Sequence, residues 1–120
     1  MLANLTKSKH LSLVDMGSAA DLHCPRCNAD LLHHFRVTVF YRSEDDDSVV
    51  RTRVTGSTVA VDVAESRDAG NPSARRDGMA IEFYCEGCGG GKPDDLIELT
   101  IAQHKGSTEI GWRFTPKPPS

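Results

Sequence analysis

Four cysteines, arranged as two pairs with the same spacing, constrain this chain more than any other feature. They stand in "LHCPRCNAD" as Cys24 and Cys27, and in "EFYCEGCGGG" as Cys85 and Cys88. The two residues inside a CxxC turn curl the backbone so that both sulfurs point toward one centre, and four thiolates satisfy the tetrahedral preference of zinc. In a reducing compartment such pairs are more typical of metal sites than of disulfides. We therefore predict one structural Zn²⁺ held by these four cysteines.

The motifs "CPRC" and "CEGC", each beside an expected β-strand, resemble the two knuckles of the zinc-ribbon superfamily. This resemblance implies a four-cysteine zinc site formed where two β-hairpins meet. Fifty-seven residues separate Cys27 from Cys85, whereas about 15 to 20 are usual, and an inserted hairpin carrying residues 44–78 accounts for the excess. The chain as a whole also resembles small uncharacterised zinc-ribbon proteins of phages and mobile elements, and that likeness implies no activity.

Other uses of the cysteines stay open at this point. Mononuclear iron and iron–sulfur clusters also bind four cysteines, and spacing does not separate them from zinc. Thiol redox chemistry normally uses a CxxC at the junction of a strand and a helix, where the helix N-terminus lowers a thiol pKa, and no helix is expected after either pair. Three histidines near the pairs, His23, His33 and His34, offer an alternative ligand or a hydrogen bond to a thiolate. The cysteine set is complete without them.

Alternating apolar residues predict an all-β domain, because successive side chains of a strand point to opposite faces. No long helix is indicated. We expect an antiparallel sheet of about six strands, with Val59, Val61 and Val63 facing inward. The expected strands cover residues 36–41, 49–55, 57–64, 79–85, 96–104 and 108–114.

One domain is expected over residues 21–115. Residues 1–20 show only weak apolar spacing and predict a flexible arm or a short helix, while the proline-rich residues 116–120 predict a disordered tail. The apolar fraction of 38% and the aromatic fraction of 6% are low for one domain. A structural metal would therefore supplement a small core.

The charge balance argues against a generic phosphate-binding surface. Fourteen basic and seventeen acidic residues give a formal charge of −3, and four thiolates around one Zn²⁺ add a further charge of about −2. Binding to nucleic acid requires clustered, uncompensated Lys and Arg. No apolar stretch suits a secretory signal or a membrane span, so we expect a cytoplasmic protein.

Four thiolates would close the coordination shell of zinc, which leaves no position for a catalytic water. The sequence also lacks the common nucleophile, metalloprotease and phosphate-loop motifs. We therefore expect a non-enzymatic binding module whose partner is another protein. The alternative is a nucleic-acid-binding ribbon that uses four arginines. These are Arg51, Arg53, Arg75 and Arg76.

Two charged segments are left without an assigned role by the sequence. The acidic residues 44–47 at a predicted hairpin tip resemble, in outline, the acidic tip with which some transcription-elongation zinc ribbons hold Mg²⁺, and a solvated turn uses the same residues. Residues 65–78 form a long polar loop that carries Arg75 and Arg76, and loops of this length tend to be functional or mobile. Asp68 and Asp77 lie near enough in sequence to neutralise its arginines.

Overall fold

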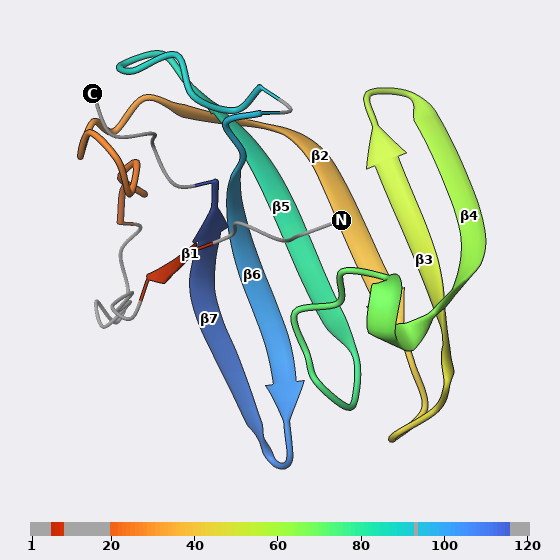
Figure 1. Cartoon of the computed structure of the whole chain (residues 1–120). Helices are drawn as coiled ribbons and strands as arrows, with labels where there is room; N and C mark the ends of the chain where they lie inside the picture. Colours follow the sequence, from red (N-terminus) through yellow and green to blue (C-terminus); the bar gives the residue numbers. More distant parts are fainter. Residues whose placement is uncertain (1–5, 9–19, 93, 116–120) are drawn as a thin grey trace.

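The structure, a computed structural model, describes residues 6–8, 20–92 and 94–115. It is an all-β protein with one antiparallel sheet, as the alternation predicts (Figure 1). Six strands are long, and a seventh is short. The strands are β1 (Thr6–Ser8), β2 (Leu32–Tyr41), β3 (Ser48–Thr55), β4 (Thr58–Glu65), β5 (Gly78–Cys85), β6 (Ile97–His104) and β7 (Ser107–Phe114), with one 3₁₀ turn, η1 (Ser66–Asp68).

Two three-stranded meanders make most of the sheet, whose order is β1-β7-β6-β5-β2-β3-β4. β2, β3 and β4 form one meander, β5, β6 and β7 form the other, and β2 pairs with β5 where they join. In this pairing Leu32, at the start of β2, lies opposite Cys85, at the end of β5. The segment before β2 and the segment after β5 therefore leave the sheet at the same end.

The predicted insertion is the hairpin β3–β4, which extends the sheet beyond β2 (Figure 1). A two-residue turn, Gly56–Ser57, joins its strands, with Thr55 opposite Thr58. Gly56 has a φ of +59°, a conformation that glycine adopts without steric cost. The hairpin lengthens the chain between the two cysteine pairs while leaving the β2–β5 pairing intact.

The two faces of the sheet differ in their side chains, because directly paired residues share a face. One face, here the valine face, carries apolar residues across six strands; the register runs Val59, Val54, Val37, Ile81, Leu99 and Trp112. The other, here the arginine face, carries Arg51 and Arg53 beside Phe40 and Ala80. Both candidate binding arginines of β3 therefore lie on the arginine face.

Each face has a packed core at a different end. On the valine face, the end near the cysteines holds a cluster of Phe83, Cys85, Ile97 and Trp112, against which Cys24 packs from the segment before β2. On the arginine face, Ala69 from the loop after β4 packs on Phe40, Val49 and Ala80. In Figure 1 this loop, in green, folds back across the sheet.

The expectation that the β4 valines face a core is wrong. Val59, Val61 and Val63 are 64%, 64% and 67% exposed. The loop that follows β4 covers the opposite face, where it reaches Phe40 and Val49. Alternation shows that the three valines share a face, but it does not show which face the chain later covers.

A row of charged side chains crosses the arginine face near the cysteine end. Arg36 on β2 is paired with Glu82 on β5 at 3.3 Å, and Arg113 on β7 is paired with Glu98 on β6 at 2.5 Å. Glu98 is 7% exposed. Burial raises the pKa of its carboxyl group, and the guanidinium of Arg113 opposes this increase. The pair keeps this buried carboxylate matched with a cation.

The terminal segments are described only in part. Within residues 1–20, expected to be an arm or a short helix, the structure describes β1, which pairs with β7, and Ala20. The rest of that segment and the expected tail, residues 116–120, lie outside the described residues.

Replacing Gly78 with alanine should loosen the loop that covers the arginine face. A Cβ at Gly78 would lie 2.2 Å from Asn71 Oδ1 and 2.9 Å from the Pro72 ring, so the loop would have to move. We expect Gly78→Ala to lower the free energy of unfolding by about 1–3 kcal/mol, measured by urea denaturation. Gly106→Ala is the matched control, because its Cβ would meet nothing within 4 Å. Equal stability of the two variants would contradict this account of the loop.

Candidate metal centre

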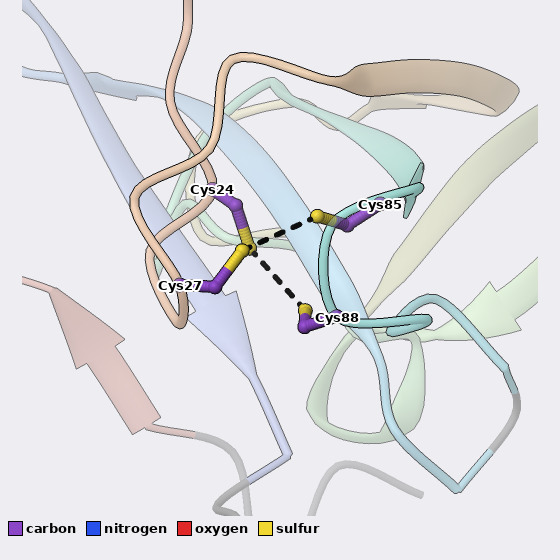
Figure 2. A group of neighbouring side chains, drawn as sticks. All are labelled: Cys24, Cys27, Cys85 and Cys88. Atoms are coloured by element: carbon purple, nitrogen blue, oxygen red, sulfur yellow. Dashed lines mark hydrogen bonds between the residues drawn. The ribbon is translucent and has the colours of Figure 1, made fainter.

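The four cysteines come together at the end of the sheet where β2 begins and β5 ends. Their Sγ atoms all lie within 4.8 Å of one another, and Figure 2 shows the four side chains converging. The Sγ–Sγ distance is 3.8 Å between Cys24 and Cys88, and 3.6 Å between Cys27 and Cys85. A tetrahedral ion with metal–sulfur distances of about 2.3 Å requires sulfurs about 3.8 Å apart. The cluster therefore has the dimensions of a four-thiolate metal site.

Equivalent backbone hydrogen bonds build the two knuckles. In the first, the Cys24 N–H donates to the Ala29 carbonyl at 2.8 Å, and the Asn28 N–H donates to the Cys24 carbonyl at 2.9 Å. In the second, the Cys85 N–H donates to the Gly90 carbonyl at 2.8 Å, and the Gly89 N–H donates to the Cys85 carbonyl at 2.9 Å. The donors and acceptors occupy the same positions relative to the first cysteine of each pair.

The residue after the second cysteine is also equivalent in the two knuckles. Asn28 has a φ of +65° and Gly89 has a φ of +72°. Asparagine and glycine are the residues that adopt this left-handed conformation most readily. In the first knuckle the Arg26 N–H also points to Cys24 Sγ at 3.4 Å. A residue that favours a left-handed turn therefore follows the second cysteine in both knuckles.

The second knuckle is fixed against its surroundings by close contacts that exclude larger residues. A Cβ at Gly87 would lie 3.1 Å from Cys27 Sγ and 2.8 Å from the Ala29 Cβ. The Glu86 N–H donates to the Leu31 carbonyl at 3.1 Å, which ties this knuckle to the chain just before β2. The two knuckles therefore meet as packed units rather than through the sulfurs alone.

Arg26, inside the first knuckle, makes contacts that the sequence pattern does not predict. Its side chain is 7% exposed, its Nη2 lies 2.6 Å from Asp95 Oδ1, and its guanidinium lies 5.2 Å from the centre of the Phe114 ring. Nε and Nη2 have no partner with hydrogen-bond geometry, so the pair with Asp95 acts through charge. It joins the first knuckle to the segment after the second. A basic residue inside a CxxC turn was the available signal.

The histidines near the cysteines make other contacts. The ring of His23 is hydrogen-bonded through Nδ1 to the Asn28 carbonyl at 2.8 Å, and His33 on β2 contacts the carboxylate of Glu86. His34 is exposed. Among the described residues, the group of side chains that could hold a metal consists of the four cysteines.

The thiols of the cluster differ in acidity. Burial raises the pKa of Cys24 to about 12 and also raises the pKa of Cys88. The pKa of Cys85 is lowered to about 7, because the backbone N–H of Cys88 and the neighbouring thiols of Cys27 and Cys24 outweigh the effect of burial. Without a metal the cluster therefore holds protons near neutral pH. A metal ion would have to displace them, since the thiolate is the ligand.

The structure brings the acidic tip and the arginine loop together. Arg75 forms two hydrogen bonds of 2.7 Å with the carboxylate of Asp45, and Arg76 contacts the carboxylate of Glu44. The Arg75 side chain lowers the pKa of Asp45, mainly by hydrogen bonding. The acidic tip and the arginine loop, which are separated by 30 residues in the sequence, are thus joined by ion pairs. Asp68 is instead near Arg67, at 3.8 Å.

The arginines of β3 are also engaged. Arg51 pairs with Asp62 on β4 through contacts of 2.9 and 2.5 Å, and Arg53 donates to the Thr38 hydroxyl at 3.4 Å. Arg51 is far from the cysteines, because it lies opposite Phe40, and Phe40 lies opposite Gly78 at the start of β5, whereas Cys85 ends that strand. The loop with Arg75 and Arg76 also meets β5 at Gly78. The structure therefore separates the candidate metal centre from the candidate binding arginines.

Within the described residues, no helix has the length and apolar character that a membrane crossing requires.

Removing one thiol should abolish both metal binding and the folded state. We expect Cys27→Ser and Cys85→Ser to lose the cooperative thermal transition seen by circular dichroism, because metal binding supplies much of the stability of small metal-dependent domains. Cys85 is fully buried, so its substitution also places a hydroxyl in the core, whereas Cys27 is exposed. Cys27→Ser therefore isolates the metal contribution. A native-like melt of Cys27→Ser would contradict a structural role for the site.

Comparison of the chain with models of protein families, with curated proteins and with solved structures finds no match in any of the three. The resemblance to zinc ribbons therefore depends on residues and geometry: two CxxC turns with equivalent hydrogen bonds, carried by paired strands of one sheet. The four-cysteine cluster is compatible with a zinc-ribbon-like metal site.

Proposed function

We propose that the chain binds one Zn²⁺ through Cys24, Cys27, Cys85 and Cys88, and that the ion has a structural role. The observation that carries this proposal is the spacing of the four sulfurs, with edges of 3.6 and 3.8 Å, which fits tetrahedral zinc. When bound, zinc would cross-link the segment before β2 to the segment after β5. Four thiolates complete its coordination, so this proposal includes no catalytic step.

The fold disfavours the redox alternative, and spectroscopy separates zinc from iron. A redox CxxC usually stands at a helix N-terminus, which stabilises the thiolate, and in the described part of the chain both pairs lie in turns of an all-β fold. Iron fits the same ligands. The ions are distinguished by spectroscopy, because a four-thiolate iron site absorbs visible light and zinc, with a filled d shell, does not.

Metal analysis of the purified protein tests this proposal. We expect one zinc per chain by elemental mass spectrometry, a colourless protein, and loss of the cooperative melt after incubation with a chelator. Restoring Zn²⁺ to the chelated sample should restore the melt. Iron with a visible absorption band would replace zinc in the assignment, and a melt unaffected by chelation would remove the structural role.

We further propose that the protein is a non-enzymatic module that binds another protein. Three of the four arginines of the nucleic-acid alternative are paired within the chain: Arg51 with Asp62, Arg75 with Asp45 and Arg76 with Glu44. Phosphate contacts would have to break these pairs at a net charge of −3. The same contacts occupy the acidic tip, which disfavours Mg²⁺ binding there. The apolar valine face supports a protein partner.

Heparin chromatography and a salt titration of DNA and RNA binding separate the two partner classes. We expect the protein to pass through heparin at about 0.15 M salt, because its arginines are neutralised, and we expect Arg75→Ala with Arg76→Ala to change nothing. The variant should fold, since both side chains lie in a loop and are at least one quarter exposed. Binding that falls steeply with salt and is weakened in the variant would instead favour the nucleic-acid alternative.

A further inference from the structure

Much of the valine face is open. Seven of its apolar side chains are between 38% and 67% exposed: Val39, Tyr41, Val54, Val59, Val61, Val63 and Ile110. The register places them on one face, since Val39 lies opposite Thr52 and Met79, and the row continues to Val61 on one side and Ile110 on the other. Seven side chains exposed to this extent on one face form a large apolar patch, and large patches of this kind mark interaction sites.

The face is also almost free of charge. Among the strand residues that share it, the charged one is Glu65, at the end of β4. The pair of Arg51 with Asp62 projects from the other side of the sheet, and the pair of Arg75 with Asp45 projects from the loops. A polynucleotide or an anionic membrane would require cations on this surface. Its chemistry suits another apolar protein surface.

The segments of this sequence outside the described residues are too short to cover the β4 valines. Residues 9–19 connect Ser8, which lies opposite Trp112, to Ala20, and Leu22 packs on the cluster of the same tryptophan. β4 is five strand spacings from β7, about 24 Å at about 4.8 Å each. A path from β7 to β4 and back needs about 48 Å, whereas residues 9–19 span about 40 Å when fully extended. Residues 1–5 and 116–120 reach about 17 Å each.

A second copy of the chain has a matching surface. A shallow hollow of about 220 Å³ lies on this face. It is lined by the apolar Val39, Met79 and Ile101, by the polar Asp77 and Gln103, and by Tyr41, which is 65% exposed. A two-fold axis would place the tyrosine of each copy against the hollow of the other, as an isologous contact requires. Two chains that each carry a charge of −3 would meet at an almost uncharged face. The exposed residues run from β4 to β7, and a stable interface buries roughly 800 Å² on each partner.

We infer that two copies of this chain pack valine face against valine face and form a two-layer β-sandwich. In such a sandwich the inner side chains of the sheets interdigitate at a separation of about 10 Å. Pairing of two β4 edge strands is the other symmetric arrangement. It would extend the sheet and leave the apolar face open and larger, so it does not account for the exposed valines. Face-to-face packing does.

Light scattering on a size-exclusion column and analytical ultracentrifugation test this inference on the full chain. We expect the wild type to have twice the mass of one 13.1 kDa chain at micromolar concentrations. Val61→Lys should be monomeric, with dimerisation weakened at least about 100-fold, because it places a charge among the most exposed valines of the proposed interface. The substitution should leave the single chain folded, since Val61 is 64% exposed.

Ala60→Lys is the matched control, because Ala60 is exposed on the same strand but belongs to the arginine face, opposite Arg53. It should remain dimeric. A monomeric wild type up to about 200 µM, a concentration well above the Kd of most specific complexes, would overturn the inference and leave the face for a different partner. Equal loss of the dimer in Ala60→Lys and Val61→Lys would also overturn it, in favour of edge pairing.

The inference specifies a partner for the proposed protein-binding module but depends on the valine face rather than on zinc. Measuring zinc in the same samples separates the two. A monomer with one zinc per chain contradicts the dimer alone, and a zinc-free dimer contradicts the proposed structural metal alone. Val61 is on β4 and distant from the cysteines along the sheet order, so Val61→Lys should keep its zinc.

Discussion

Pairing between β2 and β5 is the constraint on which the rest of this structure depends. It places Leu32 opposite Cys85, so that one knuckle leads into the pair of strands and the other leads out of it at the same end. Each meander then grows outward from this central pair, and the long hairpin β3–β4 is added at one edge. The cysteine cluster tolerates the insertion because the insertion lies beyond β2 in the sheet and does not separate the knuckles in space.

The two knuckles reach the same local conformation with different sequences. Their hydrogen bonds and their left-handed residues coincide, although one has asparagine and the other glycine at that position. Packing of Gly87 against Cys27 and the charge contact of Arg26 with Asp95 then hold the knuckles together. These contacts preorganise the sulfurs. They would lower the cost in conformational entropy of cross-linking two segments that are far apart in the chain through a metal ion.

Charge and apolar surface are separated between the two sides of the sheet. The arginine face and its loop neutralise themselves through pairs such as Arg51 with Asp62 and Arg75 with Asp45. Exposed ion pairs of this kind contribute little to stability individually, but each one neutralises the arginine that takes part in it. The valine face has few such groups, and it remains half open because the described residues cover each face at only one end.

The sequence by itself determined the all-β class, the positions of the six long strands and the four cysteines that gather, because alternation and CxxC spacing are local patterns. It did not determine that residues 44–45 meet residues 75–76, that Arg26 is buried, or that the β4 valines face outward. Those facts depend on which segment crosses which face after the strands have paired. A period of two in the sequence assigns side chains to a common face, but the covering of that face is decided by contacts between residues distant in the chain.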